Sequence, residues 1–148
     1  LPDDCYPVYA ALLANLTARN FRVEETELPP GVHGSCQPDG RIRLETMLDS
    51  RNKILVLAHE VCHWAAHFGR QAEGLTTADM EFQAEATAVV IGAMFGIESP
   101  TAADYILSWH GDAEKLRSEL QTIHGLVKRV CDLLKIEEVL TEAHEAAA

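Results

Sequence analysis

Three residues with metal-binding spacing interrupt an otherwise apolar stretch between residues 54 and 69: His59, Glu60 and His63. Four residues turn an α-helix by about 400°, so the two histidines project from one face and can bind the same ion. Glu60 lies at the flank of that face, where a general base can take a proton from water on the ion. This H-E-x-x-H arrangement is typical of zinc-dependent peptide hydrolysis.

A second apolar stretch, from 78 to 95, carries Glu81 and Glu85. Burying unpaired carboxylates costs several kcal/mol each, so two buried helices that carry His and Glu need a cation between them. We expect Glu85 to be the third ligand, because its neighbours Ala84 and Ala86 are small enough to let the helices approach. Glu81 is closer to the start of the helix, and we expect it to orient a ligating histidine or to stabilise the first turn.

Another histidine, His67, lies one turn beyond His63. A single tetrahedral ion is not expected to be reached by all three imidazoles, so we interpret His67 as a residue at the rim of the site. Zn²⁺ is the expected ion, and Mn²⁺ is compatible with the same ligand types. The alternative is a pair of hydrogen-bonded core histidines, an interpretation that leaves Glu60 and Glu85 without counter-charges.

Composition limits the classes of function. The chain has 148 residues and a formal net charge of −11, which disfavours nucleic acid as a partner of this domain alone. The sequence contains no run of 18 or more apolar residues, so it predicts no membrane span. Its four cysteines are widely spaced and no signal peptide is evident, which predicts reduced thiols and a cytoplasmic location, with a Cys5–Cys36 bridge as the alternative. We treat residues 1–148 as one domain trimmed from a longer chain.

Periodicity and turn chemistry predict the elements that must position these residues. We expect helices at 6–20, 50–69, 78–95, 101–110 and 113–134, a strand at 21–28, a hairpin at 31–46 and a frayed tail at 137–148. Pro38-Asp39-Gly40 supplies the hairpin turn. Asp49 or Ser50 is the expected N-cap of the helix with the H-E-x-x-H residues, and Thr77 that of the next helix.

Three segments resemble a known family: LAHEVCHWAAH, EFQAEATAVVIGAMFGI and ADYILSWHGD. They are similar to the zincin-like metallopeptidase domain of ArdC-type antirestriction proteins and, more distantly, to the ImmA/IrrE metallopeptidases, over roughly residues 40–134. The resemblance implies a compact α+β fold, mostly helical, with a small antiparallel sheet beside the H-E-x-x-H helix. It also implies Glu85 as the third metal ligand and a substrate lying along an edge strand, which we expect at 41–45.

The function predicted from sequence is zinc-dependent hydrolysis of a peptide bond in a protein. His59, His63 and Glu85 would hold the ion, and Glu60 would activate water. ImmA/IrrE relatives cleave helix-turn-helix repressors, so the resemblance implies such a repressor as substrate. Tyr105 is a candidate for oxyanion stabilisation or substrate contact, with a packing role as the alternative. The rival function is a catalytically silent module on the same scaffold that acts by binding in antirestriction or repressor control.

Overall fold

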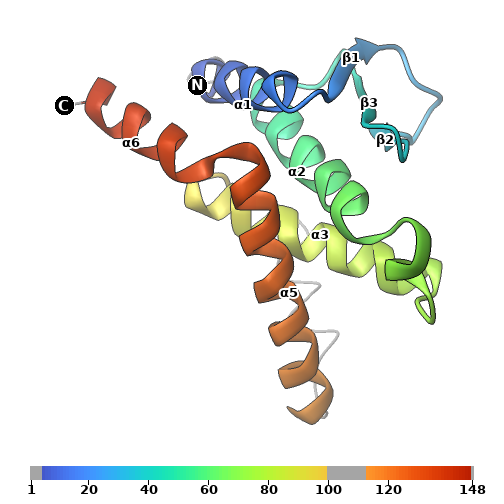
Figure 1. Ribbon diagram of the computed structural model, residues 1–148. Coiled ribbons are helices and arrows are strands. Elements are labelled where there is room, and N and C mark those ends of the chain that lie inside the picture. Colours follow the sequence, from blue (N-terminus) through green and yellow to red (C-terminus); the bar gives the residue numbers. More distant parts are fainter. Residues whose placement is uncertain (1–4, 100–112, 148) are drawn as a thin grey trace.

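The computed structural model describes residues 5–99 and 113–147, which form a mostly helical α+β arrangement (Figure 1). The elements in chain order are α1 (Tyr6–Ala18), β1 (Arg22–Thr26), β2 (Gly34–Cys36), β3 (Arg41–Glu45), α2 (Ser50–Ala66), the 3₁₀ turn η1 (Gly69–Ala72), α3 (Thr77–Met94), α5 (Ala113–Leu134) and α6 (Ile136–Ala147). The predicted helix at 101–110, and Tyr105 within it, lie outside the described residues. Among the helices described, none has the length and apolar character to cross a bilayer.

The sheet is mixed, so the prediction of an antiparallel sheet is wrong. Its strand order is β1-β3-β2, with β3 parallel to β1 and antiparallel to β2. The hairpin between β2 and β3 forms as predicted, and Gly40 takes the left-handed φ of 91° in its turn. The segment 27–33 contains two prolines and carries the chain across to the far side of β3, so β1 cannot pair with β2 in a hairpin.

Strand β3 is the central strand of the sheet, whereas the sequence predicted it to be the edge strand. Its Ile42 and Leu44 side chains are fully buried under α2, which explains the central position. The edge strand beside α2 is β2. This correction matters because an edge strand is the part of a sheet that can pair with an added peptide.

Helix α2 lies across the sheet and carries the H-E-x-x-H residues. Of the two predicted N-caps, Asp49 is confirmed: its side chain accepts a hydrogen bond from the backbone N–H of Asn52 at 2.9 Å, and Ser50 is the first residue of the helix. Near the other end, the Trp64 indole N–H donates to the Pro38 carbonyl at 3.1 Å, and the Trp64 ring packs edge-on against Phe21 with centroids 4.7 Å apart. These contacts fix the β2–β3 turn against the helix.

Helix α3 crosses α2 and supplies the acidic residues of the site (Figure 1). It begins one residue earlier than predicted, because Thr76 is the N-cap and exchanges hydrogen bonds of 3.0 Å with Asp79 in a capping box. Towards its other end, a Cβ added at Gly92 would overlap Leu55 of α2. Gly92, which the sequence analysis did not single out, thus lets the two helices approach closely.

Helix α6 replaces the frayed tail that the sequence predicted at 137–148. It turns back towards α1 after Lys135, which adopts a left-handed φ of 53° (Figure 1). Ile136 and Val139 are 1% and 3% exposed, because their spacing places both on one face of the helix. The Asn15 amide of α1 also donates to the Leu134 carbonyl at 2.8 Å.

Candidate metal centre

Two imidazole nitrogens and one carboxylate meet where α2 and α3 cross. The Nε2 atoms of His59 and His63 are 3.1 Å apart. Glu81 reaches both, with Oε1 2.9 Å from His63 Nε2 and Oε2 3.3 Å from His59 Nε2. Two nitrogens at ~2.1 Å from a tetrahedral ion lie about 3.4 Å apart. The spacing of these donor atoms therefore fits a single divalent ion, and His59, His63 and Glu81 form a group that could hold one.

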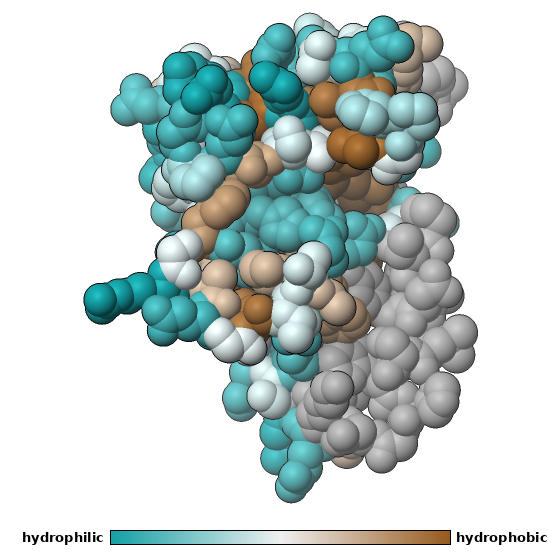
Figure 2. All heavy atoms as spheres, turned by 90° about the vertical axis from the view of Figure 1, so that its right-hand side faces the viewer, coloured by the Kyte–Doolittle hydropathy of each residue, from teal (hydrophilic) through white to brown (hydrophobic). Residues whose placement is uncertain are grey.

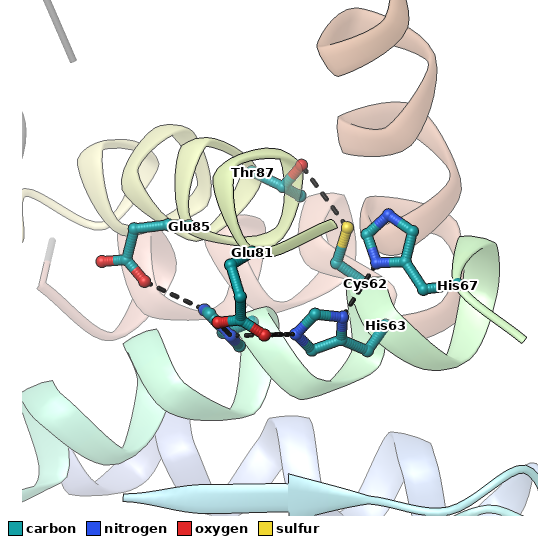
Figure 3. A network of polar contacts seen from close by, with 7 residues as sticks. Cys62, His63, His67, Glu81, Glu85 and Thr87 are labelled. Carbon is teal, nitrogen blue, oxygen red and sulfur yellow. Dashed lines mark hydrogen bonds and ion pairs between the residues drawn. The ribbon is translucent and has the colours of Figure 1, made fainter. Parts of the chain in front are cut away.

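Glu85 contacts the other side of the His59 ring. Its Oε2 lies 2.9 Å from Nδ1 of His59, the nitrogen that points away from the group of three (Figure 3). Glu81, which the sequence analysis expected to orient a histidine, thus lies close to both Nε2 atoms, whereas Glu85, the expected third ligand, contacts Nδ1 of His59. The sizes of neighbouring alanines indicate how closely the helices approach, but not which turn of α3 faces the imidazoles.

Glu60 is buried beside the histidines, with 7% of its surface exposed. Burial raises its pKa to about 7, and the nearby Glu81 charge adds to the rise while His59 opposes it. Within the described part of the chain, its carboxylate has no hydrogen-bond partner. A buried carboxylate of this kind suits a general base that works near neutral pH.

Gly34 makes room for the Glu60 carboxylate, and the sequence analysis did not single it out. A Cβ added at Gly34 would lie 2.6 Å from Val56 Cγ1 and 3.1 Å from Glu60 Oε2. Strand β2 therefore approaches α2 closely at the site. The only sequence signal for this contact was a glycine within a predicted strand, which is typical of close backbone approach.

The pKa values of the two histidines shift in opposite directions. The pKa of His63 is lowered to about 4, mainly by burial; the neighbouring imidazoles of His59 and His67 act in the same direction, and Glu81 opposes them. Burial acts in the same direction on His59, but the Glu85 hydrogen bond and the charges of Glu60 and Glu81 raise its pKa overall. His63 is thus neutral at pH 7 and keeps a lone pair for a ligand bond.

His67 is buried, so its interpretation as a rim residue is wrong. It is 7% exposed, and its Nδ1 lies 2.8 Å from Nδ1 of His63 (Figure 3). Its Nε2 lies 2.8 Å from Oε1 of Gln83 on α3, which is 6% exposed. Helix α2 ends at Ala66, so His67 occupies the cap position, where α3 covers it. Sequence reasoning missed Gln83, although a polar residue in an apolar helix was a usable signal.

The site opens into a cleft of ≈ 560 Å³ between α2, α3 and the segment that leads into β2. Its lining combines the polar residues of the site with an apolar wall that includes Val32, Leu55 and Val56. Figure 2 views the molecule from the side of the sheet and shows hydrophilic side chains in a hollow near the middle of that face, with apolar ones around it. The candidate metal centre is therefore accessible from this cleft.

The four cysteines are free thiols, and no Cys5–Cys36 bridge forms. Burial raises the pKa of Cys62 to about 11 and that of Cys36 to about 12, with the Glu60 and Asp39 charges adding to the latter rise. Neither group is therefore a thiolate near neutral pH. The expectation that Cys62 belongs to the core is confirmed, since it is fully buried and its Sγ lies 3.6 Å from Thr87 Oγ1.

Comparisons of the chain with protein-family models, with curated proteins and with solved structures found no match. The resemblance to ArdC-type and ImmA/IrrE metallopeptidases therefore stays a prediction.

Proposed function

We propose that this protein is a metal-dependent peptidase that hydrolyses a peptide bond in a protein substrate. The observation that supports the proposal best is the meeting of His59, His63 and an α3 carboxylate beside the buried Glu60, at the floor of a cleft. A purely structural metal site has no need of a further, unligated carboxylate such as Glu60. Glu60 thus favours hydrolysis over a silent binding module.

In this proposal, His59 and His63 hold a divalent ion, Zn²⁺ or Mn²⁺, through Nε2. Glu81 is the third ligand favoured by the distances, and Glu85 fixes the His59 ring through Nδ1. The family resemblance favours Glu85 as the ligand instead, and zinc titration of Glu81→Gln and Glu85→Gln separates the two. When bound, such an ion polarises a carbonyl and lowers the pKa of water.

Glu60 is the proposed general base. Its carboxylate accepts a proton from the attacking water and then donates it to the leaving amine nitrogen. Two features of the chain support this role: the pKa of Glu60 is raised to about 7, and Gly34 leaves space beside its carboxylate. A base with a pKa near the working pH combines a large ionised fraction with a useful proton affinity.

We propose that the substrate adds to β2 as a further strand. The His33 carbonyl accepts from the Glu45 N–H, and the Gln37 N–H donates to the Arg41 carbonyl, both at 2.9 Å. Alternation in an antiparallel pair then directs the backbone groups of Gly34 away from β3. An extended peptide can pair with such an edge. A flexible segment of a helix-turn-helix repressor is the proposed substrate, as the family resemblance implies.

The test compares wild type with Glu60→Gln on a quenched-fluorescent peptide library with added Zn²⁺. We expect kcat to fall about 10²- to 10⁴-fold in the variant, because the base is lost while the ligands remain. Zinc stoichiometry should be unchanged, and chelation should abolish wild-type hydrolysis. Equal hydrolysis by both proteins would contradict the assignment of Glu60. Zinc binding without hydrolysis of any peptide by wild type would favour the silent binding module.

A further inference from the structure

A buried chain of hydrogen bonds leads away from His63 on the side opposite the candidate metal centre. Nδ1 of His63 lies 2.8 Å from Nδ1 of His67, and Nε2 of His67 lies 2.8 Å from Oε1 of Gln83. His67 and Gln83 are 7% and 6% exposed, so water does not readily replace either partner. None of these contacts is needed to bring the ligands together, so this series of hydrogen bonds requires a separate explanation.

Two arrangements of the protons are possible along this series of hydrogen bonds, because each neutral imidazole carries one N–H. In the first, His67 donates from Nε2 to Gln83 Oε1 and accepts at Nδ1 from His63, whose Nε2 keeps its lone pair. In the second, all donors are reversed, and His63 carries its proton on Nε2, where it donates to Glu81 Oε1 at 2.9 Å as long as no cation lies between them. Only the first arrangement uses the Gln83 oxygen as an acceptor, which is how the structure orients that amide.

We propose that Gln83 and His67 are positioning residues that hold His63 as the Nδ1–H tautomer, with the Nε2 lone pair directed at the cation site. The inference rests on the proposed metal site and deepens it. Neither residue touches the substrate or the ion. Both act through His63, the residue whose nitrogen must be free of a proton to bind metal.

Helix α3 then orients both ligating imidazoles by different routes. Glu85 accepts directly from His59 at 2.9 Å, the common arrangement in which a carboxylate fixes the remaining N–H of a ligand. Gln83, two residues earlier on the same helix, acts on His63 through His67. A neutral relay places no further negative charge in a site that already holds Glu60, Glu81 and Glu85.

The first test measures zinc affinity by competition with a chromophoric chelator. Gln83→Met removes the acceptor at similar size, and we expect about 10- to 100-fold weaker binding. His67→Asn places an amide oxygen where Nδ1 stood, so it still accepts from His63 and should bind within about threefold of wild type. The double variant should match His67→Asn, because Gln83 acts only through the ring of His67.

The second test reads the tautomer of His63 directly from ¹⁵N NMR of the metal-free chain of residues 1–148. We expect the proton on Nδ1 in wild type and a shift towards Nε2 in Gln83→Met. Thr87→Val is the control, since Thr87 is fully buried on the same helix but contacts Cys62. It should alter stability without moving the His63 signal.

Two results would overturn the relay: a proton on Nε2 in wild type, or wild-type zinc affinity in Gln83→Met. Failure of the peptidase proposal looks different. A wild-type protein that binds no zinc would remove the metal site, whereas the NMR measurement would still decide the tautomer.

Discussion

Two carboxylates one helical turn apart, Glu81 and Glu85, contact opposite nitrogens of the same imidazole. The Glu81 side chain is 58% exposed and can turn towards an incoming ion, whereas that of Glu85 is 38% exposed and contacts Nδ1 of His59. One helix can thus supply both a ligand and the group that orients a ligand. The division of roles depends on where each turn of α3 crosses α2.

Gly34→Ala tests the close approach of β2 to the site. The added methyl group would lie 2.6 Å from Val56 Cγ1, too near for an unstrained contact. We expect the free energy of unfolding to fall by about 1–3 kcal/mol, as for other overpacked positions, and hydrolysis to fall with it because Glu60 is displaced. Urea denaturation and the peptide assay measure the two effects.

A second substitution separates overpacking from loss of backbone freedom. Adding Val56→Ala removes the methyl group that clashes, so the double variant should regain part of the stability lost in Gly34→Ala. Gly125→Ala is the control, because a Cβ there meets nothing within 4 Å on helix α5. It should stabilise the protein by about 0.5–1 kcal/mol. No recovery in the double variant would contradict the steric account.

At the level of single residues, sequence was most informative where the geometry is local. His59 and His63 share one helix, so their common face follows from the helical repeat alone. The roles of Glu81 and Glu85, and the burial of His67, depend on how two helices cross. That crossing is set by contacts such as Gly92 against Leu55, which lie far apart in sequence.

The elements show the same division between local and non-local information. The range of β3, the hairpin turn and the Asp49 cap were all predictable, because turn and cap chemistry acts within a few residues. The parallel pairing of β1 with β3 was not, since it depends on the path of the segment 27–33. The packing of α6 against α1 was also not predictable, because it joins segments at opposite ends of the chain.

Ile136→Ala tests whether α6 is a packed element of the fold. Ile136 is 1% exposed and lies in the main core cluster, so its truncation should lower the free energy of unfolding by about 2–5 kcal/mol. Glu138→Ala, on the exposed face of the same helix, should change it by less than about 0.5 kcal/mol. If both substitutions changed the free energy of unfolding by the same small amount, α6 would not be packed against the core.

At the scale of the whole molecule, one carboxylate connects three elements. Glu25 on β1 accepts a hydrogen bond from the Tyr9 hydroxyl of α1 and another from the Lys53 ammonium group of α2, both at 2.8 Å. The Lys53 contact is the largest influence and lowers the pKa of Glu25; burial opposes it and the Tyr9 hydrogen bond adds to it. Glu25 thus links the helices to the sheet in its ionised form.

This contact predicts a pH dependence of stability. Because the pKa of Glu25 is lower in the folded chain, its contribution is fully present above the unfolded pKa of about 4.3 and is lost as the pH falls towards the folded value. Glu25→Gln should therefore lose less stability than wild type between pH 7 and pH 3. The difference should stay below about 1 kcal/mol, because the side chain is 36% exposed.

Urea unfolding at pH 7 and pH 3 measures this difference in stability, with Glu24→Gln as the control. Equal losses of stability in wild type and Glu25→Gln would contradict the role of Glu25.

Titration of the metal-free chain with Zn²⁺ tests the central claim most directly. We predict about one equivalent bound by wild type and none by the double variant His59→Ala/His63→Ala, with circular dichroism to confirm that the variant is folded. Glu81→Gln should weaken binding more than Glu85→Gln if Glu81 is the ligand, and the reverse order would assign Glu85. Absence of zinc binding by wild type, or equal binding by the double variant, would contradict the claim that α2 and α3 together hold a metal ion.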